Sequence, residues 1–169
     1  LMMQGIAMLI VVTGNDQFMH FIVDLRSGHA SIQGALALSQ EGGWPLVVAV
    51  WSIFIAIAIN LAAPPFSAWL ADSYPEASPS GSVFLSAFTT KSAVYVLLLL
   101  FWGNPLLLVV GLMMVFYGII MAMLENDMRR ILSYSIINQV GFMVTAIGIG
   151  SELALAGAAA HAFCHIIYK

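Results

Sequence analysis

Residues 64–91 read PPFSAWLADSYPEASPSGSVFLSAFTTK, and this stretch decides how the chain is organised. It begins with two prolines, which cannot continue a helix because each lacks an amide donor and clashes with the preceding turn. It ends with Lys91, which lies between two apolar runs. A lysine in the middle of a hydrocarbon layer costs about 2.5–3.5 kcal/mol on insertion scales. We therefore interpret Lys91 as a charge that is retained inside a membrane for a function.

The composition is that of an integral membrane protein. Of the 169 residues, 62% are hydrophobic and 8% are charged, whereas soluble domains carry about 25% charged residues. The net charge of −3 gives no reason to expect a nucleic-acid partner. The one cysteine, Cys164, excludes an internal disulfide framework, and no metal-ligand spacing such as HExxH is present. No flavin motif or nucleotide-binding loop occurs either, so we expect no cofactor, no metal and no catalytic residue on this chain.

Several apolar segments approach the roughly 20 residues that a transmembrane helix needs. We predict spans at 44–63, 82–101, 105–124 and 131–150, a further span starting in 152–169, and a partial first span at 1–14. A short interfacial helix is expected near 31–40. Residues 64–81 are expected to form a broken, proline-rich segment, with Trp69 and Tyr74 as anchors at the headgroup level.

The predicted fold class is therefore an all-α, polytopic transmembrane helical bundle of about six helices, counting the partial first span and the broken segment. The chain lacks an initiator Met and ends within a helical pattern. We interpret residues 1–169 as one transmembrane domain that is a fragment of a longer subunit.

Basic residues predict the orientation in the membrane. If the spans alternate, Arg129 and Arg130 lie on the same side as residues 64–81, and Arg26 lies on the opposite side. The positive-inside rule then places 64–81 and 125–130 in the cytoplasm.

Asn60, Asn138 and Gln139 lie within the predicted spans, and their amides need internal hydrogen-bond partners because hydrocarbon offers none. Asn60 and Asn138 are the candidates for a place on the path. From the residues alone, a hydrogen bond that joins helices is the simpler interpretation of Asn60, and a place on a hydrated path is the alternative.

The last segment carries His161, His165 and Lys169 at steps of four residues. At 3.6 residues per turn, each step turns about 400° and rises about 6 Å, so the three side chains share one helical face. A neutral imidazole can accept a proton on one nitrogen and donate from the other. We therefore favour a proton relay over a purely structural role for this row.

Three motifs carry a resemblance to a known family: the stretch 64–91, then NDMRRILSYSIINQVGFM, then HAFCHIIYK. With the span before them they cover about residues 44–169. In this order they resemble the proton-antiporter-type membrane subunits of respiratory NADH dehydrogenase (complex I), membrane-bound hydrogenases and multisubunit Mrp-type cation/proton antiporters. The second motif, with GIGSELALAGA after it, leans toward the D-like branch of the Mrp subunits.

The resemblance implies a long helical bundle with buried lysines, histidines and a glutamate along its midplane. Lys91 matches the family's buried lysine after the amphipathic segment. His161, His165 and Lys169 match its histidine–histidine–lysine row. Asn60 departs from the pattern, since many members have a lysine there, and this puts a complete pumping unit of the complex I kind in doubt.

Three functions follow as hypotheses. The first is proton, or cation/proton, translocation by a Lys/His relay within a multisubunit Mrp-type antiporter, with Asn60 and Asn138 lining the path from Lys91 to His161, His165 and Lys169. The second is the proton-pumping membrane subunit of an NADH:quinone oxidoreductase or hydrogenase, and the third is a structural membrane subunit. The expected partners are other membrane subunits, the lipid bilayer, protons and Na⁺ or K⁺, in a bacterial plasma membrane. Whether the chain belongs to an enzyme complex is left open.

Overall fold

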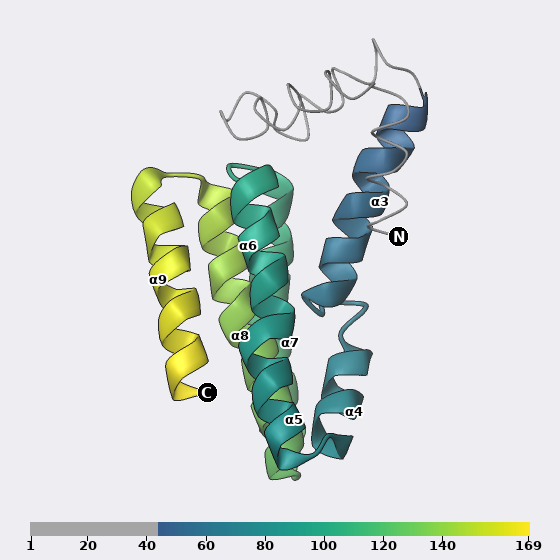
Figure 1. The fold of residues 1–169 in the computed structure, drawn as a ribbon, viewed down its shortest axis with the longest axis vertical. Helices are drawn as coiled ribbons and strands as arrows, with labels where there is room; N and C mark the ends of the chain where they lie inside the picture. The colour runs from purple at the N-terminus through teal and green to yellow at the C-terminus, as the bar shows by residue number, and fades with distance from the viewer. Residues whose placement is uncertain (1–43) are drawn as a thin grey trace.

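The computed structural model describes residues 44–169, which fold into helices joined by short turns (Figure 1). Within this range there is no β-strand, which agrees with the predicted all-α membrane bundle. The expected partial first span at 1–14 and the interfacial helix near 31–40 lie outside the described residues.

Three continuous helical stretches of the described part are long and apolar enough to cross a membrane: Pro79–Leu100, Pro105–Leu124 and Met128–Ile149. The first of them is built from two α-helices with a π-helical turn between them. In chain order the helices are α3 (Trp44–Asn60), α4 (Ala68–Glu76), α5 (Pro79–Phe84), the π turn η1 (Leu85–Thr89), α6 (Thr90–Leu100), α7 (Pro105–Leu124), α8 (Met128–Ile149) and α9 (Glu152–Tyr168).

Local capping explains where most helices begin. The Asn104 and Asp127 side chains accept from the amides of the residues two positions later, and Ser78 and Ser151 accept from the amides three positions later. These are the residue types that satisfy free amides at a helix N-terminus. Because Asp127 caps α8, that helix begins at Met128 and not at the predicted residue 131.

The break between α3 and α4 comes earlier than predicted. The span expected at 44–63 ends at Asn60, because Ala62 adopts a left-handed φ of 57° and the prolines follow. Pro75 does not break the chain as expected but lies inside α4, next to its last residue. Pro79 occupies the first turn of α5, where proline is well tolerated. The span expected at 82–101 therefore begins at Pro79.

Glycines bring α7 and α8 into backbone contact. A Cβ atom at Gly118 of α7 would lie 2.6 Å from the Asn138 amide nitrogen, and one at Gly148 of α8 would lie 2.5 Å from the Leu108 amide nitrogen. A Cβ atom at Gly111 would meet the Thr145 hydroxyl of α8, and one at Gly141 would lie 2.8 Å from the Val115 amide nitrogen of α7. Each helix thus has two glycines seven residues apart, close to two turns, which keeps them on one face. Small residues of this kind allow close packing where lipid gives no hydrophobic drive between helices.

The helices are arranged so that α9 stands beside α8 and α6, and α3 lies at the opposite side of the bundle (Figure 1). The turns 77–78 and 125–127 lie at one end. The turns 101–104 and 150–151 lie at the other, where the Gly103 amide donates to the Ile147 carbonyl at 2.9 Å. We call the first of these the arginine end, because Arg129 and Arg130 lie there.

Candidate functional site

The buried charge of the bundle is Lys91, on the first turn of α6. Its side chain is 6% exposed, and its ammonium donates to the Ser86 carbonyl at 2.6 Å. Ser86 belongs to the π turn η1. A π turn replaces the regular α-helical hydrogen-bond ladder with wider i→i+5 bonds and often marks a functional position. Within residues 44–169 no carboxylate pairs with Lys91.

The neighbouring hydroxyl groups on the same helical stretch are buried as well. Ser86 is 8% exposed and Thr90 is 0% exposed. Neither hydroxyl has a hydrogen-bond partner among the described residues. A buried polar atom without a protein partner is normally satisfied by ordered water.

Across from this stretch lies the histidine row of α9, which contacts both η1 and α6. The rings of His161 and His165 are nearly parallel, with centroids 6.3 Å apart, as the spacing of four predicts. His165 is fully buried, and neither of its ring nitrogens has a partner within the described part of the chain. The Nε2 atom of His161 also has no hydrogen-bond partner there. Lys91, Lys169 and His161 all lie within electrostatic range of His165.

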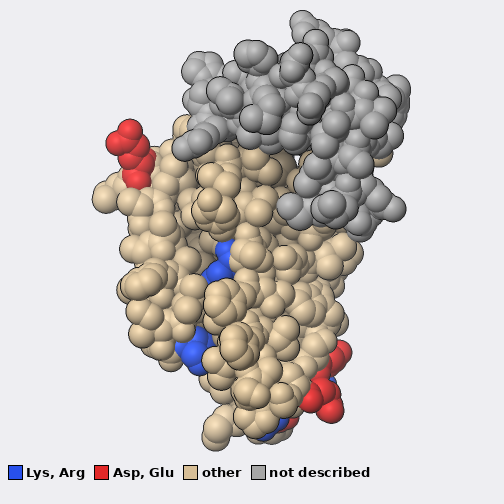
Figure 2. Space-filling view, viewed as in Figure 1, with Lys and Arg blue, Asp and Glu red and all other residues tan. Residues whose placement is uncertain are grey.

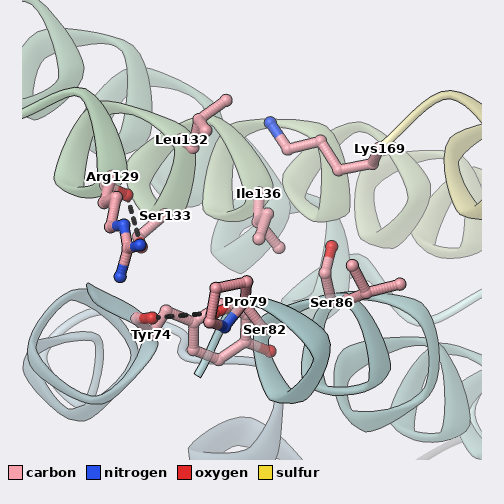
Figure 3. A pocket seen from close by; sticks show the side chains of 10 residues that line it. Tyr74, Pro79, Ser82, Ser86, Arg129, Leu132, Ser133, Ile136 and Lys169 are labelled. Atoms are coloured by element: carbon pink, nitrogen blue, oxygen red, sulfur yellow. Dashed lines mark hydrogen bonds between the residues drawn. The ribbon is translucent and has the colours of Figure 1, made fainter. Parts of the chain in front are cut away.

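Lys169 ends the row, and its ammonium donates to the Ser135 hydroxyl of α8 at 3.0 Å. It also lines a cavity of about 190 Å³ between α4, α5, η1 and α8 (Figure 3). The other labelled residues around this cavity are Tyr74, Pro79, Ser82, Ser86, Arg129, Leu132, Ser133 and Ile136. The cavity extends from the arginine end to Lys169 and to Ser86, the residue that binds Lys91.

On the surface, blue side chains appear within an otherwise tan face, and the red side chains of that face lie toward its two ends (Figure 2). The lysines of the described range are Lys91 and Lys169. Lys91 lies in the first turn of α6, and Lys169 directly follows the last residue of α9.

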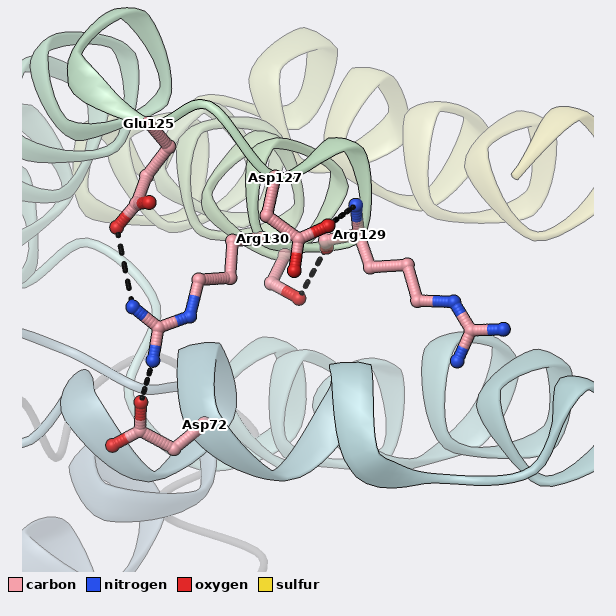
Figure 4. Close-up of polar contacts among 6 residues, drawn as sticks. Asp72, Glu125, Asp127, Arg129 and Arg130 are labelled. Carbon is pink, nitrogen blue, oxygen red and sulfur yellow. Dashed lines mark hydrogen bonds and ion pairs between the residues drawn. The ribbon is translucent and has the colours of Figure 1, made fainter.

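The arginine end is held together by side chains from α8. The Arg130 guanidinium lies 2.9 Å from the Asp72 carboxylate and 3.6 Å from the Glu125 carboxylate (Figure 4). Arg129 donates to the Pro75 carbonyl at 2.9 Å. These contacts confirm the prediction that residues 64–81 and 125–130 share one side. They also offset the unfavourable position of two cations in the first turn of a helix.

The two expected aromatic anchors have other roles. The Trp69 indole donates to the Ile59 carbonyl at 2.8 Å, which ties α4 back to the end of α3. Tyr74 is only 5% exposed, and its hydroxyl donates to the Leu85 carbonyl at 2.9 Å. Tyr74 is therefore not a headgroup-level anchor, because the fold of α4 turns it inward against η1.

Asn60 and Asn138, the two amides predicted to line the path, lie in different parts of the bundle. Asn60 is half-buried and is the last residue of α3, directly before the break. Asn138 is half-buried on α8, and its backbone faces Gly118 of α7. The structure thus gathers Lys91, His161, His165 and Lys169 around α6 and α9. Among the described residues, no hydrogen bond joins the Asn60 or Asn138 side chain to this group.

Two contacts beside this group were not predicted from the sequence. Ser135 accepts from the Lys169 ammonium across 34 residues of chain, and Tyr74 donates to the Leu85 carbonyl of η1 across 11 residues. The signal for Ser135 was its place within the predicted span 131–150, where a hydroxyl needs a partner.

Comparison with known proteins matches the chain over residues 1–169 to the family described as NADH:quinone oxidoreductase/Mrp antiporter, transmembrane. The chain belongs to this family. It is 34% identical over 121 residues to the M subunit of NADH-quinone oxidoreductase from Escherichia coli K12, covering 66% of this chain and 24% of that protein. It is 32% identical over 141 residues to the D subunit of the Na(+)/H(+) antiporter from Alkalihalophilus pseudofirmus, covering 78% of this chain and 28% of that protein.

The family fold is also seen in a solved structure. The Mrp complex from Dietzia sp. DQ12-45-1b contains a chain that matches 98% of this one with a TM-score of 0.77 and 23% identity, over 30% of its own length. The chain spans about a quarter of the length of the curated relatives it matches. Membership confirms the resemblance drawn from the three motifs, and it makes the chain an integral membrane protein of this family.

Proposed function

We propose that this chain is part of a subunit that translocates protons, or exchanges a cation for protons, across a membrane as a member of a multisubunit complex. The observation that carries the proposal is the burial of Lys91 in an apolar helix, with no carboxylate partner among residues 44–169 and with unpartnered hydroxyls and imidazoles on the elements beside it. A charge kept in hydrocarbon without a structural ion pair is a mark of an ion or proton path.

The relay begins with the Lys91 ammonium, which holds a proton against the Ser86 carbonyl. Water that satisfies Ser86 and Thr90 accepts this proton and passes it to a ring nitrogen of His165. Because an imidazole accepts at one nitrogen and donates from the other, His165 passes a proton on without rotating away from its neighbours. His161 and Lys169 flank His165 on the same face and continue the path in the two directions along α9.

The cavity at the arginine end supplies the aqueous entrance. It reaches Lys169 directly and reaches Lys91 through Ser86. In this proposal the entrance faces the cytoplasm, since Arg129 lines the cavity and both arginines lie at that end of the bundle. Asn60, at the break after α3, and Asn138, within α8, are assigned to hydrated positions along the same path.

The complex is of the Mrp type in the first form of the proposal, with other membrane subunits as partners and Na⁺ or K⁺ as the exchanged cation, in a bacterial plasma membrane. The relatives named for an Na(+)/H(+) antiporter and for an Mrp complex support this form. The second form is a proton-pumping subunit of an NADH:quinone oxidoreductase, which the relative named as the M subunit of such a complex supports. In the second form the redox chemistry belongs to partner chains.

The decisive experiment replaces Lys91 by Ala in the full-length subunit, assembled in its complex and reconstituted into vesicles with a trapped pH-sensitive dye. We expect proton movement driven by an Na⁺ or K⁺ gradient to fall to the level of empty vesicles. Ser92→Ala, which alters the next residue on the exposed side of α6, is the matched control and keeps the wild-type rate. If the assembled Lys91→Ala complex moves protons at the wild-type rate, the proposal is wrong and the chain belongs to a structural subunit.

A further inference from the structure

Two adjacent backbone carbonyls of the π turn η1 accept hydrogen bonds from side chains. The Tyr74 hydroxyl donates to the Leu85 carbonyl at 2.9 Å, and the Lys91 ammonium donates to the Ser86 carbonyl at 2.6 Å. Both donors are buried, at 5% and 6% exposure. Burial raises the pKa of the Tyr74 phenol to about 12, so this hydroxyl stays protonated and remains a donor at neutral pH.

Tyr74 is held firmly in its place on α4. The Ser82 hydroxyl of α5 donates to the Tyr74 carbonyl at 3.2 Å. The next residue, Pro75, offers its carbonyl to Arg129 of α8. Tyr74 is therefore bound from three sides: by α5 through Ser82, by α8 through its neighbour Pro75, and by η1 through its own hydroxyl.

A π turn is rare because its geometry is less favourable than that of an α-helix, and it persists where surrounding contacts support it. Its i→i+5 hydrogen bonds enclose one residue more than the i→i+4 bonds of the α-helical ladder do. If η1 relaxed to an α-helix, the two halves of the stretch 79–100 would rotate relative to each other by about 100°, the angle between successive α-helical residues. Lys91 would then leave the side of the helix that faces α9.

We infer that Tyr74 is a positioning residue for Lys91: its hydroxyl, bound to the Leu85 carbonyl, holds η1 in the π form that offers the Ser86 carbonyl to the Lys91 ammonium. The inference rests on the function proposed for Lys91 above. It gives α4, an amphipathic segment at the arginine end, a direct physical link to the buried charge. Movement of α4 is thereby coupled to the orientation of Lys91.

The groups that act on Lys91 electrostatically come from α9. Lys169 and His165 lie within range of it, and His161 flanks His165. Residues 44–60 of α3, which also packs on α6, include no charged residue. The titratable groups of α8 are Arg129, Arg130 and Tyr134, and all three lie in its first two turns, at the arginine end. A substitution at Tyr74 therefore affects Lys91 through η1, since α3 carries no charge that could act on Lys91.

The test is Tyr74→Phe in the full-length subunit, assembled and reconstituted as for Lys91→Ala. Phenylalanine keeps the ring and its packing and removes only the hydroxyl. We expect the exchange rate to fall at least fivefold, and the pH at which exchange is half-maximal to move to lower pH, because the charged lysine loses its fixed acceptor. Tyr95→Phe, a 61% exposed tyrosine on the same helix as Lys91, leaves the rate and the pH profile unchanged.

The outcomes separate the inference from the proposed function. If Lys91→Ala is inactive while Tyr74→Phe matches the wild type in rate and pH profile, the inference alone is wrong. If Lys91→Ala retains exchange, the proposed function is wrong, and the inference about Tyr74, which rests on it, is wrong as well. Loss of assembly in Tyr74→Phe would also overturn the inference, because the hydroxyl would then serve folding and not the placement of Lys91.

Discussion

Arg130 and Asp72 form an ion pair at 2.9 Å, although 58 residues of chain separate them. This contact joins α4 to the start of α8, and Arg129 reinforces it through the Pro75 carbonyl. The broken proline-rich segment is thereby fixed against the helix that carries Ser135, the partner of Lys169. Since α4 also carries Tyr74, one end of the bundle connects the exposed ion pair with the buried Lys91 and the half-buried Lys169.

We expect the Arg130–Asp72 pair to contribute little to stability by itself. Its side chains are 42% and 66% exposed, and exposed pairs contribute about 0.2–1 kcal/mol. A double-mutant cycle with Arg130→Gln and Asp72→Asn, measured by unfolding of the full-length protein in detergent, should give a coupling energy in this range. Glu152→Gln, an exposed change at the opposite end of the bundle, serves as control. A coupling above about 3 kcal/mol, the scale of broken buried pairs, would contradict the exposed character of this contact.

The glycine contacts between α7 and α8 predict that replacing a contact glycine by alanine lowers the stability of the protein. Gly118→Ala places a methyl group 2.6 Å from the Asn138 amide nitrogen, so the helices must separate, at a cost of about 1–3 kcal/mol. Gly157→Ala on α9 meets nothing within 4 Å and should be neutral or stabilising by up to about 1 kcal/mol, since alanine is the better helix former. Thermal unfolding in detergent compares the two. Equal stability of both variants would mean that α7 and α8 are not in backbone contact.

We predict that substitution of Ser135 lowers the exchange rate and leaves the fold intact. In Ser135→Ala the Lys169 ammonium loses an acceptor at 3.0 Å, and hydrogen bonds to charged groups contribute about 1.5–3 kcal/mol. We expect exchange to slow by about tenfold in reconstituted vesicles, since 1.4 kcal/mol corresponds to a factor of ten. Ser92→Ala is the control, because its exposed hydroxyl bonds to the Thr89 carbonyl of its own helical stretch and lies outside the cavity lining. The prediction fails if the two variants exchange at the same rate.

The order of elements could be read from the chain because the signals are local. The predicted span 105–124 coincides with α7, where Asn104 and Pro105 mark the start. The proline pair ends α3 close to the expected place. The histidine row was also predictable, since three residues at steps of four share a face of any α-helix.

The errors have a common physical cause. Tyr74 was expected at the membrane surface because aromatic residues in interfacial segments anchor there, yet it is buried against η1. The span with Lys91 was predicted at 82–101, and the π turn that it contains was not predicted. In both cases a contact with another element outweighs the local preference.

By itself the sequence determined that this is a helical membrane protein, the order and approximate positions of its apolar spans, and which of them carry charge, because apolar length, proline and capping residues act within a few residues of where they occur. Only the tertiary structure decided that Lys91 bonds to a carbonyl of a π turn, that Tyr74 supports this turn and that Ser135 receives Lys169. These contacts join residues from separate helices or from distorted backbone, and they exist only once packing has fixed how the helices face each other.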